Sequence, residues 1–302
     1  MSEPLLVVGS LAYDDIETAS EKGEGLLGGS ASHFSLAASL AGAIPRIVAV
    51  VGEDFAEEDL ALLSALPADI EGVERASGET FRWGGVYKED FSERKTLYTK
   101  LGVFENFQAK LPESYRKSET VFLANIHPAL QWQVLEQVDH PVLLALDTMN
   151  LWIESCPADL KKVIAKVDLL FINDEEARLL SGDNNLVSAG RKLLDMGPSA
   201  CLLKKGEHGV LLFLGEKVIP FPSFPLADPR DPTGAGDSFA GGVMGFLARE
   251  PRLEESCLRP AVLAGSVLGS MAVEGLGVSG LQRKSQAEFR HRLRQFTELL
   301  AL

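Results

Sequence analysis

The sequence has 302 residues with 43 acidic and 29 basic side chains, which give a formal net charge of −14. This balance argues against a protein that mainly binds nucleic acid or anionic membrane surfaces, because such proteins carry a basic face. Hydrophobic residues make up 46% of the chain and charged residues 24%, as in soluble globular proteins. At about 150 residues per domain, the length allows one large domain or two small ones.

The start of the chain and the cysteines bear on its location. The opening MSEPLLVVGS has no basic region and only a short apolar run, so we expect no signal peptide. No run approaches the ~18 apolar residues that span a bilayer. Cys156, Cys201 and Cys257 are too far apart for a disulfide framework or a zinc knuckle. We therefore expect reduced thiols in a cytoplasmic protein.

Short apolar runs without polar alternation recur along the chain, which is typical of parallel strands covered on both faces. They lie at Leu5–Val8, Ile47–Val51, Val121–Leu123, Val142–Leu146, Leu169–Ile172 and Cys201–Leu203. Segments with helical spacing lie between them, at 30–41, 57–66, 159–165 and 186–196. This alternation predicts a doubly wound α/β fold with a mostly parallel sheet. No linker or repeat divides the chain, so we expect a single domain over residues 1–302.

Residues 78–107 break this pattern. They alternate in polarity and predict two or three strands around a polar turn, Lys88-Glu89-Asp90. The segment is rich in aromatic residues: Phe81, Trp83, Tyr87, Phe91, Tyr98, Phe104 and Phe107. A small antiparallel β flap of this kind can close over a ligand or pair with another subunit. The plainer alternative is a peripheral hairpin that packs on its own domain.

The strongest local motif is DPTGAGDSF, residues 231–239, which precedes a segment of helical composition. Gly234-Ala235-Gly236 lets backbone N–H groups converge at a helix N-terminus, which forms an anion site. Asp237 then lies in the first turn beside the anion. Since the two negative charges repel, this carboxylate is better explained as a general base for an attacking hydroxyl. A glycine-rich loop with an aspartate that stabilises the helix start is the structural alternative.

DPTGAGDSF resembles the C-terminal signature of the PfkB (ribokinase-like) family of carbohydrate and nucleoside kinases. Four other segments resemble motifs of that family in the same order. They are Gly9–Asp14, Gly28-Gly29 with its following helix, Asn173–Glu176 (N-x-x-E) and Lys204–Gly209 (K-x-G-x-x-G). The resemblance covers nearly the whole chain. It implies a ribokinase-like fold with a β lid formed by about residues 11–25 and 78–107.

The resemblance also implies roles for the matched residues. Asp237 would be the catalytic base, and Gly234, Ala235 and Gly236 would form the anion hole for the transferring phosphoryl group. The phosphate acceptor would bind at Asp14, Gly28 and Gly29, with Asp15 as a rival to Asp14. ATP would bind at Asn173, Lys204, Gly206, Gly209, Thr233, Ala264, Gly265 and Ser279. Glu176 would hold Mg²⁺, and Asp231 with Thr233 would hold a monovalent cation such as K⁺, as in some family members.

Three other candidates for substrate binding are less tied to the motifs. His33 stands where the family has a substrate-contacting asparagine, so it indicates an unusual sugar or a nucleoside, or else an ordinary helix residue. Arg82 in the flap and Asp147 at a strand end lie where this fold places substrate groups. Arg82 could bind a carboxylate or phosphate of the substrate. An ion pair with Glu79 or Glu89 explains it equally well.

The sequence thus predicts an ATP- and Mg²⁺-dependent kinase that phosphorylates a hydroxyl of a small sugar or sugar-like polyol. One alternative is a nucleoside kinase of the adenosine type, with the base stacked on the flap. A second is a non-catalytic ribokinase-fold binding protein. A vitamin kinase of the pyridoxal type is a weaker third, because such relatives generally lack the flap. The expected partners are a small-molecule substrate and a second subunit paired through the lid, with no nucleic acid and no membrane.

Overall fold

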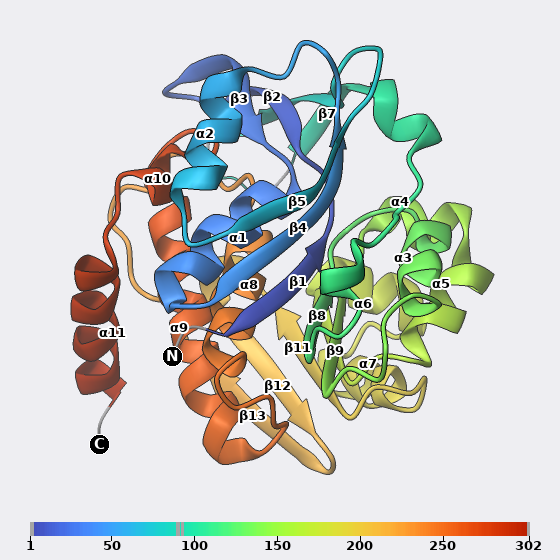
Figure 1. Cartoon of the computed structure of the whole chain (residues 1–302). Coiled ribbons are helices and arrows are strands. Elements are labelled where there is room, and N and C mark those ends of the chain that lie inside the picture. The colour runs from blue at the N-terminus through green and yellow to red at the C-terminus, as the bar shows by residue number, and fades with distance from the viewer. Residues whose placement is uncertain (1–2, 89–90, 92–93, 301–302) are drawn as a thin grey trace.

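The computed structural model describes residues 3–88, 91 and 94–300. Its described residues form two sheets, and helices cover both faces of the larger one (Figure 1). The larger sheet has nine strands in the order β13-β12-β11-β10-β9-β8-β1-β4-β5, and the smaller has four in the order β3-β2-β6-β7. Among these residues no helix is both long enough and apolar enough to cross a membrane.

The six apolar runs of the sequence form the parallel part of the large sheet. These strands are β1 (Pro4–Val8), β4 (Ile44–Val51), β8 (Thr120–Leu123), β9 (Leu143–Asp147), β10 (Leu169–Asn173) and β11 (Ala200–Lys204). Within β1, Leu5 and Val7 enter one apolar core layer, and Leu6 and Val8 enter the other. Burial on both faces explains why these runs are continuously apolar.

The edges of the large sheet escaped the sequence analysis. They are β5 (Asp69–Arg75), which pairs in parallel with β4, and the antiparallel hairpin of β12 (Val210–Leu214) and β13 (Lys217–Phe221). Strands β5 and β13 mix charged or exposed residues with apolar ones, so they lack the continuous apolar run of a central strand. Strand β12 does have such a run, VLLFL, which the sequence analysis left unassigned.

The helices divide between the two faces of this sheet. The core layer that contains Leu5 and Val7 packs against α1 (Ser30–Ala41), α8 (Ala235–Leu247), α9 (Glu255–Ala272) and α11 (Gln286–Leu300). The opposite layer packs against α3 (Pro128–Leu135), α4 (Asn150–Ser155), α5 (Pro157–Ile164), α6 (Asp174–Ser181) and α7 (Leu186–Leu194). Helices α2 (Glu57–Ala65) and α10 (Ser279–Gln282) contribute Leu63 and Leu281 to the first of these core layers.

Local sequence signals explain where several helices begin and end. Ser285 and Glu288 exchange hydrogen bonds in a capping box before α11, as the S-x-x-E pattern predicts. Helix α1 ends at Gly42, whose φ of 100° is the left-handed conformation that favours glycine. In α8, a side chain at Gly241 would collide with the backbone of Phe34. This glycine therefore lets α8 lie directly on α1.

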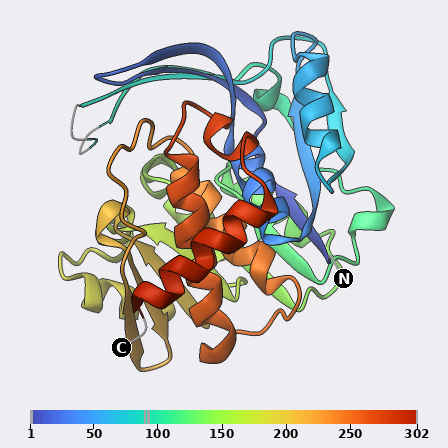
Figure 2. The same cartoon turned by 90° about the vertical axis from the view of Figure 1, so that its left-hand side faces the viewer.

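The small sheet forms a lid that extends over the top of the molecule (Figure 2). It consists of β2 (Ala12–Glu17), β3 (Lys22–Gly28), β6 (Arg82–Tyr87) and β7 (Arg94–Lys100). Its central pair, β2 with β6, is parallel, so the flap expected to be antiparallel belongs to a mixed sheet. A 3₁₀ turn at Gly102–Asn106 follows β7, in place of a third flap strand. Of the expected turn, Glu89 and Asp90 lie outside the described residues.

Candidate active site

The candidate site lies where adjacent parallel strands end. Asp147, Asn173 and Lys204 are the last residues of β9, β10 and β11, and Asn173 is paired in register with Lys204. Because the carboxyl ends of parallel strands share one edge of the sheet, three residues distant in sequence come together there. This is the edge at which α/β sheets commonly bind ligands.

Helix α8 brings the GAG segment to the same place. Gly234 has a φ of 71°, and a Cβ at this position would collide with the ring of His33. A Cβ on Gly236 would lie 3.2 Å from the Nζ of Lys204. The loop therefore fits between α1 and the end of β11, with the first turn of α8 directed at the site. Backbone N–H groups of a first helical turn lack intrahelical partners, so they can bind an anion.

Asp237 lies in this first turn and is partly exposed. Desolvation and the charge of Asp147, opposed by Lys204, together raise the pKa of its carboxyl to about 7. A carboxylate with a pKa near neutrality is suited to accept a proton at physiological pH.

Lys204, which is partly exposed, and the buried Asp147 form an ion pair of 2.7 Å. Burial lowers the pKa of Lys204, but the carboxylates of Asp147 and Glu176 outweigh it and hold the net pKa above the ordinary value. The sequence analysis placed Asp147 with the phosphate acceptor. The structure instead joins it to Lys204, beside Asp237, because β9 and β11 end at the same level.

Asn173 and Glu176 form a capping box at the start of α6. The Asn173 side chain accepts from the Glu176 backbone N–H at 2.8 Å, and the Glu176 carboxylate accepts from the Asn173 backbone at 2.8 Å. Burial raises the pKa of Glu176 to about 8. One carboxylate oxygen is thus committed to the helix start. The described residues contain no cluster of three metal ligands, so any Mg²⁺ here would keep waters and take ligands from bound phosphates.

Asp14 stands on the lid side of the same pocket. Its carboxylate lies against the backbone of Gly28, where any side chain would collide with it. Asp14 is only 5% exposed, and burial, with the nearby Asp231 and Asp237, raises its pKa to about 7. Its rival Asp15 is engaged elsewhere, because it accepts hydrogen bonds from the Tyr98 hydroxyl and the Gly25 N–H.

Gly29 and His33 connect Asp14 with the GAG segment, Gly234–Gly236, which we call the anion loop. Gly29 precedes α1 with a φ of 90°, and a Cβ there would collide with the Ser10 carbonyl. His33 is 1% exposed, and neither ring nitrogen has a hydrogen-bond partner among the described residues. Burial lowers its pKa to about 4, so the ring is neutral at pH 7 and can donate from one nitrogen and accept at the other.

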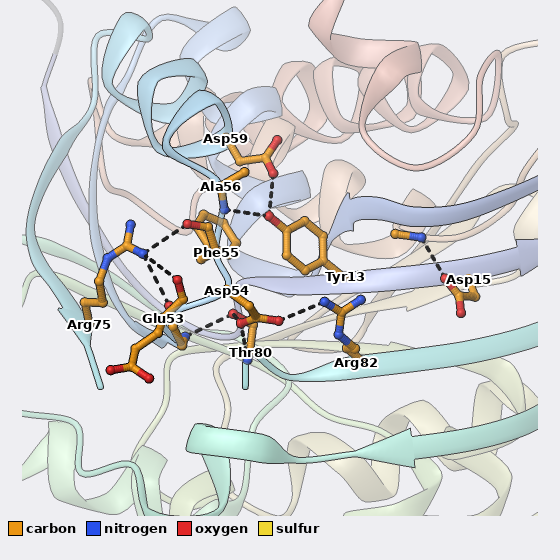
Figure 3. Close-up of polar contacts among 12 residues, drawn as sticks. Tyr13, Asp15, Glu53, Asp54, Phe55, Ala56, Asp59, Arg75, Thr80 and Arg82 are labelled. Carbon is orange, nitrogen blue, oxygen red and sulfur yellow. Dashed lines mark hydrogen bonds and ion pairs between the residues drawn. The ribbon is translucent and has the colours of Figure 1, made fainter. Parts of the chain in front are cut away.

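Arg82 does not point freely into the pocket. Its guanidinium pairs with Asp54 at 2.8 Å and lies over the Tyr13 ring, 5.1 Å from the centroid (Figure 3). Asp54 also accepts from the backbone N–H and the hydroxyl of Thr80. Arg82 is therefore part of the joint between the lid and the loop after β4, and its contact with substrate stays a prediction. Its ion-pair partner is Asp54, whereas the expected alternatives were Glu79 and Glu89, of which Glu89 lies outside the described residues.

The remaining nucleotide candidates divide into two groups. Gly206 and Gly209 have positive φ of 55° and 82° at the turn after β11, as a tight turn beside the site requires. Ala264 is fully buried, and a side chain on Gly265 would meet Phe239 and Val243 of α8. Both therefore lie in the packing of α9 on α8, and their contact with the nucleotide stays a prediction. Ser279 begins α10 and donates to the Leu276 carbonyl.

Thr233 ties the anion loop to the lid. Its hydroxyl lies 2.9 Å from that of Tyr87 in β6, and its N–H donates to Asp231 at 2.8 Å. The second oxygen of Asp231 accepts from Gly277 at 2.9 Å. The lid aromatics also separate by position, because Phe104 packs on Phe81 and Phe107 instead of facing the site.

The sequence analysis missed Arg94 and the function of Tyr87. Arg94 begins β7 directly opposite Tyr87, and its positive charge lowers the pKa of Asp237. The polarity pattern predicted this strand, but only strand pairing reveals which residues face the site. The register also pairs Trp83 with Asp14, so the indole lies on the lid surface that carries Asp14.

Comparison with known proteins supplies a family. The model of the pfkB family of carbohydrate kinases matches residues 5–279. The chain is 30% identical over 261 residues to a cytidine kinase of Thermococcus kodakarensis, covering 84% of this chain and 92% of the relative. It is 27% identical over 288 residues to a nucleoside kinase of Methanothermobacter thermautotrophicus, covering 90% of each.

Solved structures agree on the fold. The nucleoside kinase of Methanocaldococcus jannaschii, an archaeal member of the ribokinase family, has a TM-score of 0.78 at 19% identity, over 97% of this chain and 98% of that one. A putative ribokinase II of E. coli, in complex with ATP and Mg²⁺, has a TM-score of 0.79 at 17% identity, over 98% of this chain and 100% of that one. The fold is therefore ribokinase-like, as the motifs predict.

Proposed function

The chain belongs to the pfkB family of carbohydrate kinases, and on that basis we propose an ATP- and Mg²⁺-dependent kinase whose acceptor contains a pentose, a nucleoside in preference to a free sugar. The observation that carries the kinase assignment is the partly buried Asp237 in the first turn of α8, near Lys204 and the acceptor-side Asp14. The two aspartates are close enough for the charge of Asp237 to raise the pKa of Asp14. One pocket thus combines a base, an anion site and a hydroxyl-binding carboxylate.

The proposed reaction uses these groups as follows. Asp14 accepts hydrogen bonds from the acceptor hydroxyls and holds the reacting hydroxyl near Asp237. Asp237 takes the proton as the hydroxyl oxygen attacks the γ-phosphorus in line and the bond to the leaving ADP oxygen breaks. The N–H groups of Gly234–Gly236 donate to the phosphoryl oxygens, where negative charge is concentrated.

Nucleotide and metal would meet the chain at the ends of β10 and β11. Lys204 would approach the phosphates, and Gly206 and Gly209 would shape the turn beside the nucleotide. Mg²⁺, when bound, neutralises charge on the phosphates, and Glu176 with Asn173 would hold its water shell. A monovalent cation near Asp231 and Thr233 rests on the resemblance alone, and replacing K⁺ with tetramethylammonium in the assay tests it.

Two observations support a nucleoside acceptor. Trp83 lies beside Asp14 on the site-facing surface of the lid, where an indole can stack on a base, at about 1–3 kcal/mol. The cytidine kinase and the nucleoside kinase match 84% and 90% of the chain, whereas the similarity to a Klebsiella pneumoniae fructokinase covers 42% of it. The bifunctional protein HldE of Yersinia pestis also matches 80% of the chain, at 26% identity. A free sugar remains the second candidate, because Asp14 would bind its hydroxyls equally well.

A panel of acceptors tests this proposal directly. ADP release is followed with cytidine, adenosine, inosine, ribose, fructose, a sugar acid and myo-inositol, for the native chain, Trp83→Ala and the control Trp132→Ala. Trp132 lies on α3 and bonds Glu136, away from the lid. Nucleosides should give the highest kcat/KM, and Trp83→Ala should lower that value roughly 5- to 150-fold.

Each of the other outcomes would favour a different function for the protein. If a free sugar is preferred and Trp83→Ala has no effect, the protein is a sugar kinase. If ATP binds without transfer to any acceptor, it is a binding protein of this fold.

We further propose a cytoplasmic homodimer paired through the lid. Strand β7 is an edge strand of the lid sheet, and Leu97 and Leu101 on or next to it are 55% and 40% exposed. Exposed apolar residues on an unpaired edge favour pairing with a second copy. Light scattering should therefore give about twice the mass of the chain, and Leu97→Lys should reduce it to that of a monomer.

A further inference from the structure

The underside of the lid has two ends with different surroundings. Trp83, Gly85 and Tyr87 alternate along β6 and so share one face. At one end of this face, Trp83 pairs in register with Asp14, on the acceptor side of the pocket. At the other end the Tyr87 hydroxyl contacts Thr233, the residue before Gly234 of the anion loop. The Tyr87 end therefore lies over the phosphoryl position.

Arg94 occupies this second end. It is the partner of Tyr87 across the β6–β7 pair, and directly opposed residues project to the same face of a sheet. Its guanidinium lies 5.3 Å from the centroid of the Trp83 ring. No ion pair joins it to a carboxylate within the described part of the chain. Its nearness to the base appears in the pKa of Asp237, which its charge lowers.

The carboxylates of the pocket outnumber its cations, so a further cation would favour the binding of a triphosphate. Asp14, Asp147 and Glu176 are buried there and Asp237 is partly buried, and the cation at the strand ends, Lys204, already pairs with Asp147. A triphosphate adds further negative charge. The Arg94 guanidinium hydrogen-bonds the Tyr87 side chain, but its charge is not neutralised by a described carboxylate. A planar guanidinium of this kind can donate two parallel N–H groups to phosphate oxygens.

Building on the proposed kinase function, we propose that Arg94 is a catalytic residue that binds the γ-phosphoryl group during transfer. It would donate to equatorial oxygens from the lid side, while the GAG backbone donates from the opposite side. Arg94 exchanges no atom or proton. Asp237 receives the hydroxyl proton, and the new P–O bond forms to the acceptor oxygen. The electron pair of the broken P–O bond leaves with ADP.

The first test compares Arg94→Ala and Arg94→Lys with Lys95→Ala. Lys95 is an exposed cation next in sequence, and its pairing with Val86 places it on the other face of the lid. With the best acceptor, Arg94→Ala should lower kcat roughly 10²- to 10³-fold with little change in acceptor KM. Arg94→Lys should recover part of the loss, and Lys95→Ala should match the native protein.

A pH profile separates this role from a structural one. Asp237 is faced by Asp14 from β2, Asp147 from β9, Lys204 from β11 and Arg94 from β7. Loss of the Arg94 charge should move the acidic limb of kcat to higher pH. Unchanged kcat in Arg94→Ala would overturn the proposal. A rise in KM restricted to acceptors that carry their own phosphate or carboxylate would overturn it as well, because Arg94 would then bind the acceptor.

A binding measurement needs no acceptor. In the presence of Mg²⁺, Arg94→Ala should weaken the non-hydrolysable ATP analogue AMP-PNP about 10-fold, the effect of one charged contact, and leave ADP unchanged. Equal effects on both nucleotides would refute the contact with the γ-phosphate. If the native chain transfers phosphate to no acceptor but this difference persists, the kinase function fails while the contact with the γ-phosphate stands.

Discussion

The two arginines of the lid, Arg82 and Arg94, begin adjacent strands and lie at similar distances over aromatic rings, 5.1 and 5.3 Å from the centroids. Their surroundings differ. The loop after β4 offers Asp54 to Arg82, so that arginine is neutralised at the base of the lid. Arg94 meets no such carboxylate among the described residues and lies near Asp237. The same residue type therefore joins the lid to the domain at one end and, as we propose, binds the transferring phosphoryl group at the other.

The largest expected effect comes from the carboxylates that face these two arginines. Asp237→Asn should lower kcat by roughly 10²- to 10⁴-fold, because the proton acceptor is lost, while the fold is retained. Asp54→Asn should change kcat little. Coupled ADP release and thermal unfolding of both variants measure this. Near-native turnover of Asp237→Asn would refute the assignment of the base.

The two ends of the lid should also differ in pH dependence. Asp237 works deprotonated and has a raised pKa of about 7, so kcat/KM should fall as pH drops below about 7. Asp14 titrates in the same range and interacts with Asp237, so the measured values belong to the pair. A pH–rate profile between pH 5 and 9 tests this. An acidic limb near pH 4 would contradict it.

Stability should respond to pH with opposite signs at the two ends. The pKa values of Asp14 and Asp237 rise on folding, so their contribution favours the folded state at low pH and is lost as pH rises from about 4 to 7. Asp237→Asn should therefore raise Tm at pH 8 and have less effect at pH 4. Asp54, whose pKa is lowered on folding mainly by hydrogen bonds that outweigh its burial, should stabilise above pH 4 and lose this below it. Melting curves at both pH values distinguish these signs.

The ion pair at the base of the lid should contribute modestly. Both side chains are about one-third exposed, so solvent screens the attraction. A double-mutant cycle of Arg82→Ala and Asp54→Asn should give a coupling of about 1 kcal/mol in the free energy of unfolding. Zero coupling would mean that Thr80, not Arg82, is the partner that matters to Asp54.

The smallest effect is expected at the contact between lid and anion loop. Tyr87→Phe removes the hydrogen bond to Thr233 but keeps the ring, and one such bond contributes about 1 kcal/mol. We expect a decrease in kcat of several-fold, well below that of Arg94→Ala. Steady-state kinetics of the two variants, with Tyr98→Phe on the outer face of the lid as control, measure the difference. An equal decrease in kcat in both tyrosine variants would contradict a specific role of the Tyr87–Thr233 hydrogen bond.

Prediction from the sequence succeeded where local chemistry decides the outcome. The continuous apolar runs could belong only to strands or helices buried on all sides, and their length favoured strands. The string around Asp237 required a glycine-rich turn at a helix start, and the structure has one at Gly234. The contacts of Arg82 with Asp54 and of Ala264 with α8 could not be predicted from the sequence. The sequence neighbours of these two residues carry no information about Asp54 or α8, which contact them from distant parts of the chain.

The sequence alone determined the parallel strands, the helix starts at Gly29, Asn173 and Gly234, and the family of the chain, because each depends on a short run of residues. Tertiary structure decided which charges meet. Strand order joined Asp147 with Lys204, and lid pairing set Trp83 beside Asp14 and Arg94 near Asp237. Pairing between strands far apart in sequence fixes these contacts. Hence the family can be recognised from motifs, whereas the cation proposed here for phosphoryl transfer emerges only from the folded lid.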